Sequence, residues 1–393
     1  MSLMLLGFLF AAAALVLAAL STGSAIYWTL AAVLLGMVLF GAIGAVWALF
    51  SVKIGISGVK PRINRGESLM TIFTVKHASP LPVNAIRLWL SVPSAFSSTQ
   101  EINVSTPPFQ EKTFRYRIAC AHRGTYEAGI TRIGAEDVFG LFTLKKKSKS
   151  RLIKIDILPR VTDVPPLLLK ATDSGPEMIS RADEDASSPS DVRKWQDGDE
   201  LKKVHWKLTM RRKELMVRTF EESARPDTLI LPDLSPIQAL PDQALTVEDC
   251  VCEVAASAAK AQLEAGYPVR MPLTGAAPTE PAGQFPSDFP VFLESLLRVR
   301  FDSPYSYEQV LLQMQSRMQR TGGVILVTPR LTSRVADTAL KMQRTGVTVK
   351  IVWVTDSARE ESLEMVERLK MDNIIVERID PWSIADPAAK VEE

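Results

Sequence analysis

The pattern of hydrophobic and polar positions divides the chain near residue 52. Residues 1–52 contain no Asp, Glu, Lys, Arg or His, and two apolar runs, Leu3–Leu20 and Ile26–Phe50, flank the short polar sequence Ser21–Ser24. A helix needs about 20 apolar residues to cross the ~30 Å hydrocarbon core of a bilayer, because it rises about 1.5 Å per residue. The pattern therefore predicts a transmembrane helical hairpin over residues 1–52, with spans at 3–20 and 26–50.

The residues after the second apolar run predict the orientation of this hairpin. Lys53, Lys60, Arg62 and Arg65 follow it before the first acidic residue, Glu67. Basic flanks tend to stay on the cytoplasmic side, so we expect a multi-pass protein of the plasma membrane with cytoplasmic soluble domains. A cleaved signal peptide over residues 1–20 is one alternative, although no basic residue precedes the apolar run as it usually does in such peptides. A buried hydrophobic subdomain is the other.

Period-two alternation predicts strands over residues 53–165. Apolar and polar side chains alternate along Ile86–Val92 and Phe114–Cys120, and Pro-containing turns such as Ser79–Pro82 separate the runs. Short intervals between strands favour an antiparallel, sandwich-like β domain.

A basic run lies near the end of this region. Lys145–Arg151 falls between two strand-like segments, Gly140–Leu144 and Leu152–Leu158, and is therefore predicted to be the tip of a hairpin. The simplest interpretation is a solvated loop. Contact with anionic lipid is the alternative.

The composition changes twice more along the chain. Residues 166–189 are rich in small and acidic side chains, which predicts a flexible linker. From residue 227 to 382, strands such as Gly323–Thr328 alternate with helices such as Ser333–Arg344, which predicts an α/β domain with a parallel sheet and a polar tail at 383–393. We expect the helix after the first strand to begin at Thr246, where Thr246 and Asp249 have the spacing of a capping box.

The overall composition is that of an ordinary folded protein, with 23% charged residues and a net charge of +2. The three cysteines, Cys120, Cys250 and Cys252, are odd in number and show no disulfide spacing, which agrees with a reducing compartment. A lone C-x-C is a poor metal signal, so we expect Cys250 and Cys252 to be small core or surface residues.

Residues 190–226, which link the β domain to the α/β domain, mix both charge signs with two tryptophans. This mixture is typical of connected ion pairs rather than of a basic nucleic-acid surface, so no nucleic-acid partner is expected. The predicted ion-pair hub consists of Arg193, Trp195, Asp197, Gly198, Asp199, Trp206, Arg211 and Arg218. We expect Arg211 to be buried against a carboxylate, with Asp199 as the first candidate.

The same stretch resembles the signature of domain-of-unknown-function family 58. That signature runs as an Arg, an aromatic residue two positions on, Gly-Asp, a basic residue, a Trp, and then an Arg, a Leu and an Arg. Those places are filled here by Arg193, Trp195, Gly198, Asp199, Lys202, Trp206, Arg211, Leu215 and Arg218. Upstream, His122–Tyr126 and Asp137–Phe142 resemble two further family segments. The departures are mild: Val138, Lys202 and Met210 replace the usual Pro, Arg and Ala.

The resemblance implies that the C-terminal half is similar to a von Willebrand factor type A domain. In that fold an Asp-x-Ser-x-Ser loop binds a metal ion together with residues from later loops. Asp233 and Ser235 match this loop, whereas Ile237 replaces its last Ser, and Thr328-Pro329 stands where a Ser-Asp is expected. The sequence therefore predicts a degenerate site with no resident metal or other cofactor. Mg²⁺ at Asp233 and Ser235 is the alternative.

These features predict a non-catalytic, membrane-tethered scaffold whose cytoplasmic α/β domain binds a protein partner. The family resemblance implies a MoxR-type AAA+ ATPase as that partner, and a role in the assembly or maturation of envelope complexes. The alternative is a membrane-bound, hydrolase-like enzyme that uses Asp199, His205 and nearby arginines. No metalloprotease, nucleophile-elbow or phosphate-loop motif supports that alternative.

Overall fold

A computed structural model describes ten segments of the chain, which form two compact units. The segments are residues 3–58, 60–78, 84–91, 99–148, 152–169, 189–195, 204–220, 226–318, 321–357 and 360–385. The first unit comprises Met1–Arg160 with Leu296–Arg298 and Trp382–Glu393, and the second comprises Val161–Ser295 and Val299–Pro381. The predicted linker at 166–189 lies mostly outside the described residues.

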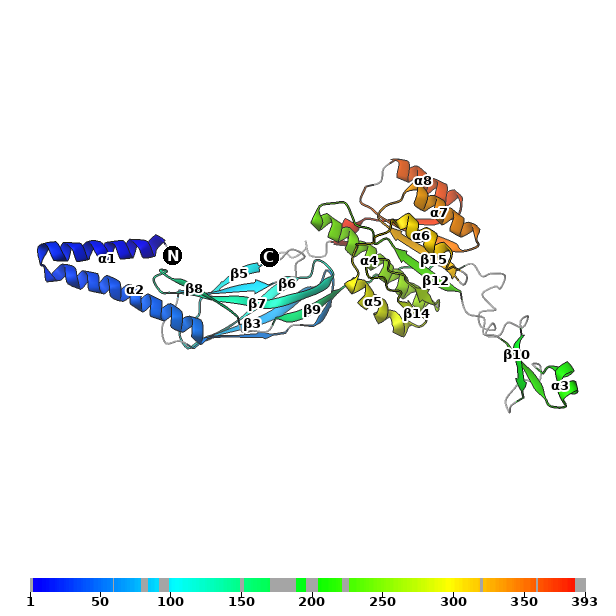
Figure 1. Cartoon of the computed structure of the whole chain (residues 1–393), viewed down its shortest axis with the longest axis horizontal. Coiled ribbons are helices and arrows are strands. Elements are labelled where there is room, and N and C mark those ends of the chain that lie inside the picture. The colour runs from blue at the N-terminus through cyan, green and yellow to red at the C-terminus, as the bar shows by residue number, and fades with distance from the viewer. Residues whose placement is uncertain are drawn as a thin grey trace. The chain divides into compact units, whose positions relative to one another are not determined.

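Two apolar helices begin the first unit, as the sequence predicts (Figure 1). They are α1 (Leu3–Thr22) and α2 (Ala25–Ser51), joined by Gly23 in the left-handed region at φ 69°. Both helices are long and apolar enough to cross a membrane by length and composition, a test that a signal sequence would also pass.

The strands of the first unit form two sheets. One has the order β1-β3-β6, and the other has the order β2-β9-β7-β4-β5 with β8 paired to β7. All pairings are antiparallel except β2 with β9. The strands are β1 (Val52–Ser57), β2 (Arg62–Asn64), β3 (Ser68–His77), β4 (Ala85–Ser91), β5 (Thr99–Val104), β6 (Glu111–Ala119), β7 (Gly124–Glu136), β8 (Thr143–Lys147) and β9 (Ile153–Leu158).

The prediction that Lys145–Arg151 forms the tip of a hairpin is wrong. Strand β7 is long enough to pair with β8 through Arg132–Glu136 and with β9 through Gly124–Ala128. Strands β8 and β9 therefore follow one another along β7 instead of pairing together. Lys145, Lys146 and Lys147 are strand residues, and 149–151 lie outside the described residues.

The second unit contains a mostly parallel sheet with the order β14-β13-β12-β15-β16-β17, in which only the pairing of β13 with β14 is antiparallel. Its strands are β12 (Asp227–Pro232), β13 (Val269–Arg270), β14 (Ala282–Gly283), β15 (Thr321–Thr328), β16 (Thr348–Val354) and β17 (Ile375–Ile379).

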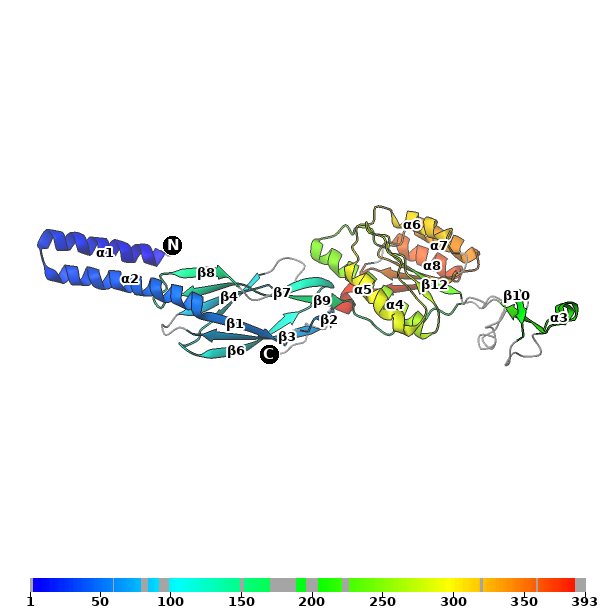
Figure 2. The same ribbon diagram turned by 60° about the horizontal axis from the view of Figure 1, so that its bottom comes forward.

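Helices cover both faces of this sheet (Figure 2). Helices α4 (Pro241–Glu264) and α5 (Phe289–Arg298) lie on one face, and α6 (Tyr307–Gln315), α7 (Ser333–Arg344) and α8 (Glu360–Met371) lie on the other. The core on the α6–α8 face is built from strand residues such as Leu229, Leu326 and Ile351 packed against Leu311 and Ala339. The chain also contains a short 3-10 helix, η2 (Pro286–Asp288), and α9 (Pro381–Ala385).

The helix ends test the predicted caps. Ser306 caps α6 through a capping box with Gln309, and α7 spans the predicted residues Ser333–Arg344. Helix α4 instead begins at Pro241, because proline suits the first turn of a helix, and the Thr246 hydroxyl donates back to the Asp242 carbonyl oxygen at 3.0 Å. Thr246 is therefore an interior residue. Cys250 and Cys252 are buried within this helix, so of the two expected placements, core and surface, the structure shows the core.

The segment after β9 joins the second unit earlier than the sequence predicts. The Thr162 backbone N–H donates to the Ser257 hydroxyl at 3.0 Å, and the Gln262 side chain donates to the Leu167 carbonyl oxygen at 3.3 Å. A side chain at Gly323 in β15 would collide with Leu169. Residues 161–169 therefore cross the α/β unit before the chain reaches the signature segment and returns at β12.

Candidate functional site at the carboxyl edge of the α/β sheet

Asp233 and Thr328 lie at the topological switch point of the sheet, where the direction in which successive strands are added reverses. After β12 the chain moves outward to β13 and β14 on one side, and then returns to β15 on the other side of β12. Asp233 follows the last residue of β12, and Thr328 is the last residue of β15. The carboxyl ends of two parallel strands at such a switch point form the usual ligand-binding crevice of an open α/β sheet.

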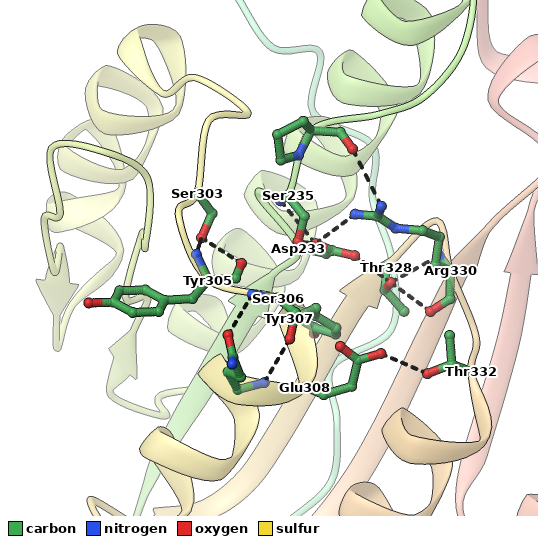
Figure 3. Close-up of polar contacts among 12 residues, drawn as sticks. Asp233, Ser235, Ser303, Tyr305, Ser306, Tyr307, Glu308, Thr328, Arg330 and Thr332 are labelled. Carbon is green, nitrogen blue, oxygen red and sulfur yellow. Dashed lines mark hydrogen bonds and ion pairs between the residues drawn. The ribbon is translucent and has the colours of Figure 1, made fainter.

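Asp233 is fully buried, and both of its carboxylate oxygens are engaged (Figure 3). Oδ1 accepts hydrogen bonds from the Ser235 backbone N–H at 3.0 Å and from the Ser235 hydroxyl at 2.6 Å. The Thr328 hydroxyl donates to Oδ2 at 2.9 Å. These contacts supply the hydrogen bonds that a buried carboxylate requires.

Arg330 provides the positive charge at this edge. Its Nη2 atom lies 3.5 Å from Asp233 Oδ1, and its Nη1 atom donates to the Pro236 carbonyl oxygen at 3.4 Å. The Arg330 backbone N–H donates to the Thr328 hydroxyl at 3.0 Å, which fixes the turn after β15. The Arg330 side chain remains 45% exposed. The arrangement can thus present a positioned guanidinium to an anionic group in solution.

Two residues of α6 complete the surroundings of Asp233. The buried Tyr307 hydroxyl donates to the Leu231 carbonyl oxygen at 2.8 Å. Burial and the negative charge of Asp233 raise the pKa of Tyr307 well above its ordinary value, so this phenol stays protonated. The Thr332 hydroxyl donates to Glu308 Oε1 at 3.0 Å. Burial raises the pKa of Glu308, but hydrogen bonds from its own backbone N–H, Thr332 and Ser306, with the charge of Arg330, lower it on balance.

The residues at this edge do not fit a Mg²⁺ ion. Mg²⁺ requires near-octahedral oxygen ligands, usually with more than one carboxylate or with substrate phosphates. Here the Asp233 carboxylate is already saturated by two hydroxyls, one N–H and a guanidinium, and the Glu308 carboxylate accepts a hydrogen bond from Thr332. The half-buried Ile237 occupies the position of the third expected ligand. Across the described residues, no three His, Cys, Asp or Glu side chains converge as a metal cluster.

The structure describes part of the predicted ion-pair hub as a separate hairpin. Strand β10 (Pro189–Lys194) pairs antiparallel with β11 (Met216–Phe220), which brings the backbones of Arg193 and Arg218 into one ladder. The Trp195 backbone N–H donates to the Leu215 carbonyl oxygen at 2.9 Å. Asp197, Gly198 and Asp199 lie outside the described residues, so the hub stays a prediction.

The short helix α3 (Trp206–Arg212) carries the remaining hub residues. Trp206 is 60% exposed, and Arg211 is also exposed, so the buried guanidinium expected at Arg211 is not found. None of the seven residues of α3 is buried in the part of the chain that the structure describes, so this helix offers Arg211 no buried position. The His205 ring caps the helix, with Nδ1 accepting the Leu208 backbone N–H at 3.2 Å.

Sequence reasoning found Asp233 and Ser235 but missed Arg330, Tyr307 and Glu308. Thr328 enters the sequence prediction only as the residue that stands in place of another expected ligand. Arg330 follows β15 by two residues, and its position at the carboxyl end of a parallel strand was the available signal. Its contact with Asp233 depends on the pairing of β12 with β15, which the sequence alone does not give.

The sequence model of the family described as "Protein of unknown function DUF58" matches residues 191–378. "Uncharacterized protein YeaD" of Bacillus subtilis (strain 168) is 24% identical over 230 residues, which cover 55% of this chain and 56% of that protein. The chain thus matches little more than half the length of this relative.

Solved structures share only limited likeness. A beta-glucosidase from Listeria innocua is 16% identical over 27% of this chain and 16% of that chain, with a TM-score of 0.19. The CARDB domain of a Pyrococcus furiosus protein is 14% identical over 27% of this chain and 86% of that chain, also with a TM-score of 0.19. At these TM-scores neither likeness assigns a fold or a function.

Proposed function

We propose that this chain, which belongs to the DUF58 family, is a non-catalytic, membrane-anchored adaptor whose α/β unit binds a protein partner. The anchor in this proposal is the α1–α2 hairpin. The basic residues that follow α2, including Lys53 and Lys60, support a cytoplasmic location for both units of the chain.

The strand order supports a von Willebrand factor type A-like architecture for the α/β unit. The first strand, β12, lies inside the sheet, its successors β13 and β14 run outward on one side, and β15, β16 and β17 run outward on the other. The antiparallel edge strand β14 fits the same architecture. In this arrangement the carboxyl edge near Asp233 is the recognition surface.

The observation that carries the proposal is the pairing of buried Asp233 with half-exposed Arg330. The pair leaves Asp233 saturated and therefore unsuited to act as a base, a nucleophile or a metal ligand. It also leaves the paired guanidinium half exposed at the surface. The group best suited to meet a guanidinium there is a carboxylate of a partner protein.

A MoxR-type AAA+ ATPase is the partner class that the family resemblance suggests, with the adaptor acting in the assembly or maturation of envelope complexes. Binding through Arg330 would require no divalent cation from this chain. Mg²⁺ would then influence the complex only through the nucleotide state of the ATPase.

Cross-linking and pull-down from membranes test this proposal. Full-length wild-type chain and the variants Arg330→Gln and Arg334→Gln are compared, with and without ATP and Mg²⁺. Arg334 is a matched control because it is an exposed arginine in the first turn of α7. We expect an ATPase to be recovered with the wild type and Arg334→Gln, and to be depleted with Arg330→Gln. Equal recovery from all three, or recovery of no protein, would refute the proposal.

A further inference from the structure

Helix α2 is longer than a bilayer requires, and its last turns belong to the β-sheet core. Its 27 residues extend about 40 Å at ~1.5 Å per residue, compared with a hydrocarbon core of ~30 Å. Ala48 and Leu49 are buried in the same cluster as Phe73 and Ile86. Val52 then begins β1 with no linker. In the membrane placement proposed above, the sheets therefore follow the membrane-spanning helix without a flexible connection.

The turn between β7 and β8 contacts α2 near the end of the span. The Phe40 and Phe139 rings lie 6.5 Å apart, and a Cβ at Gly41 would stand 2.7 Å from Asp137 Oδ2. The buried Asp137 carboxylate accepts the backbone N–H groups of Phe139 at 3.0 Å and Phe142 at 2.6 Å. A charged carboxylate is disfavoured in hydrocarbon, so the span ends at about Gly41, roughly 17 residues after its start, which is just enough to cross.

Strand β8 leads from this turn along the emerging end of α2 (Figure 1), and it is strongly basic. The Lys146 ammonium lies 5.0 Å from the Phe50 ring, and the Lys145 ammonium lies 4.6 Å from the Trp89 ring. Phe50 is about nine residues beyond Gly41, or ~14 Å along the helix axis. With the headgroup layer adding ~5–8 Å to each side of the hydrocarbon, β8 stands within about one Debye length of that layer.

The charge distribution on β7 and β8 leaves positive charge without compensation. Arg132 and Lys147 stand opposite each other in the ladder, and both are exposed. Like charges directly opposite each other are destabilising. Among the residues that the structure describes, neither has a carboxylate partner. An external anion between the two strands would remove this repulsion.

We infer that Arg132, Lys145 and Lys147 bind the headgroups of anionic phospholipids in the leaflet from which α2 emerges. The inference rests on the membrane placement in the proposed function, but it is independent of the partner site at Asp233. The first unit would then bind anionic lipids selectively, in addition to being anchored by α1 and α2. The negative surface potential of an anionic leaflet acts over the short distance at which these side chains stand.

A lipid titration of the detergent-solubilised full chain tests the inference. Phosphatidylglycerol or phosphatidylcholine is added, and the thermal unfolding midpoint is followed. We expect phosphatidylglycerol to raise the midpoint and phosphatidylcholine to have little effect. Each basic residue near an anionic surface contributes about fivefold, so the triple variant Arg132→Gln/Lys145→Gln/Lys147→Gln should need about a hundredfold more phosphatidylglycerol for the same rise.

Two further variants separate a lipid site from general charge effects. Arg132→Lys/Lys145→Arg/Lys147→Arg keeps the charges and should respond as the wild type does. Arg334→Gln/Lys341→Gln/Arg344→Gln removes three exposed charges from α7 and should also respond as the wild type does. An unchanged response in the β7–β8 glutamine variant would overturn the inference, as would an equal effect of inorganic phosphate. If the chain leaves membranes in carbonate, the anchor itself is wrong, which is a separate outcome.

Discussion

The Nη2 atom of Arg330 lies 3.5 Å from Oδ1 of Asp233, so a half-exposed guanidinium neutralises a carboxylate that has no contact with solvent. The two residues come from loops after neighbouring strands, 97 positions apart in the sequence numbering, since Asp233 follows β12 and Arg330 follows β15. The pair joins the loops after β12 and β15 and presents a guanidinium at the surface of the sheet edge. Stability and partner binding should therefore both depend on it, but in separable ways.

Arg330→Met should destabilise the α/β unit by about 1–3 kcal/mol. Removing one partner of a fully buried ion pair costs ~3–5 kcal/mol, and the exposure of Arg330 to solvent reduces this value. The double variant Asp233→Asn/Arg330→Met should lose less free energy of unfolding than the sum of the two single variants, because it leaves no buried charge without a partner. Denaturant unfolding of the four proteins gives the coupling energy. Additive effects would mean that the two side chains do not interact.

The pKa of Glu308 should depend on Thr332. Its folded-state pKa lies below the ordinary value of 4.5, so this carboxylate stabilises the fold above pH 4.5 and loses that contribution as the pH falls through the folded value. Thr332→Val removes a donor and should move the pKa back up toward 4.5, whereas Thr332→Ser keeps the hydroxyl and should leave the pKa low. NMR titration of the Glu308 carboxyl carbon distinguishes them. The same pKa in both variants would exclude the Thr332 contact.

Gly41→Ala should separate α2 from the β7–β8 turn. The added Cβ would stand 2.7 Å from Asp137 Oδ2, and the Asp137 carboxylate cannot turn away without losing its backbone donors. Overpacking of this kind costs ~1–3 kcal/mol. Gly36→Ala is the matched control, because nothing lies within 4 Å of its Cβ position and alanine favours the helix. In detergent, the midpoint temperature of thermal unfolding of the full chain should be higher for Gly36→Ala than for Gly41→Ala. The reverse order would contradict the contact.

His205 should behave as a helix cap and not as a catalytic base. His205→Ala should destabilise α3 by about 0.5–2 kcal/mol, and His205→Asn should restore most of that loss, because asparagine is a strong N-cap residue. Neither change should abolish any turnover by the full chain on a panel of generic hydrolase substrates. An activity that is lost in both variants would instead support the enzyme that uses Asp199 and His205.

The elements that the sequence predicts most reliably are those specified by residues close together in the chain. Ser306 and Gln309 cap α6 through contacts within one turn, so their spacing alone identifies the start of the helix. The uncharged run over α1 and α2 is equally local. Helix α4 shows the limit of such reasoning, because Thr246 and Asp249 have capping spacing but Pro241 begins the helix a turn and a half earlier.

The sequence predicts only part of the candidate site, because the other part depends on the order of strands in the sheet. Asp233 and Ser235 are neighbours in sequence, and their contact follows from the loop itself. Arg330 reaches Asp233 only because β15 pairs with β12 and not with β13 or β14, and strand order is a property of the folded sheet. The hairpin tip predicted around Lys145 failed for the same reason, since β8 and β9 share β7 as a partner.

A photoreactive amino acid at Gln238, an exposed position five residues after Asp233, tests most directly whether the carboxyl edge binds a protein. The same substitution at Lys341, an exposed position in the last turn of α7, is the control. Irradiation of membranes that contain the full chain should give a discrete protein adduct at Gln238 that is absent at Lys341 and is lost when Arg330→Gln is added. No adduct at Gln238, or an adduct that persists with Arg330→Gln, would contradict recognition through Arg330.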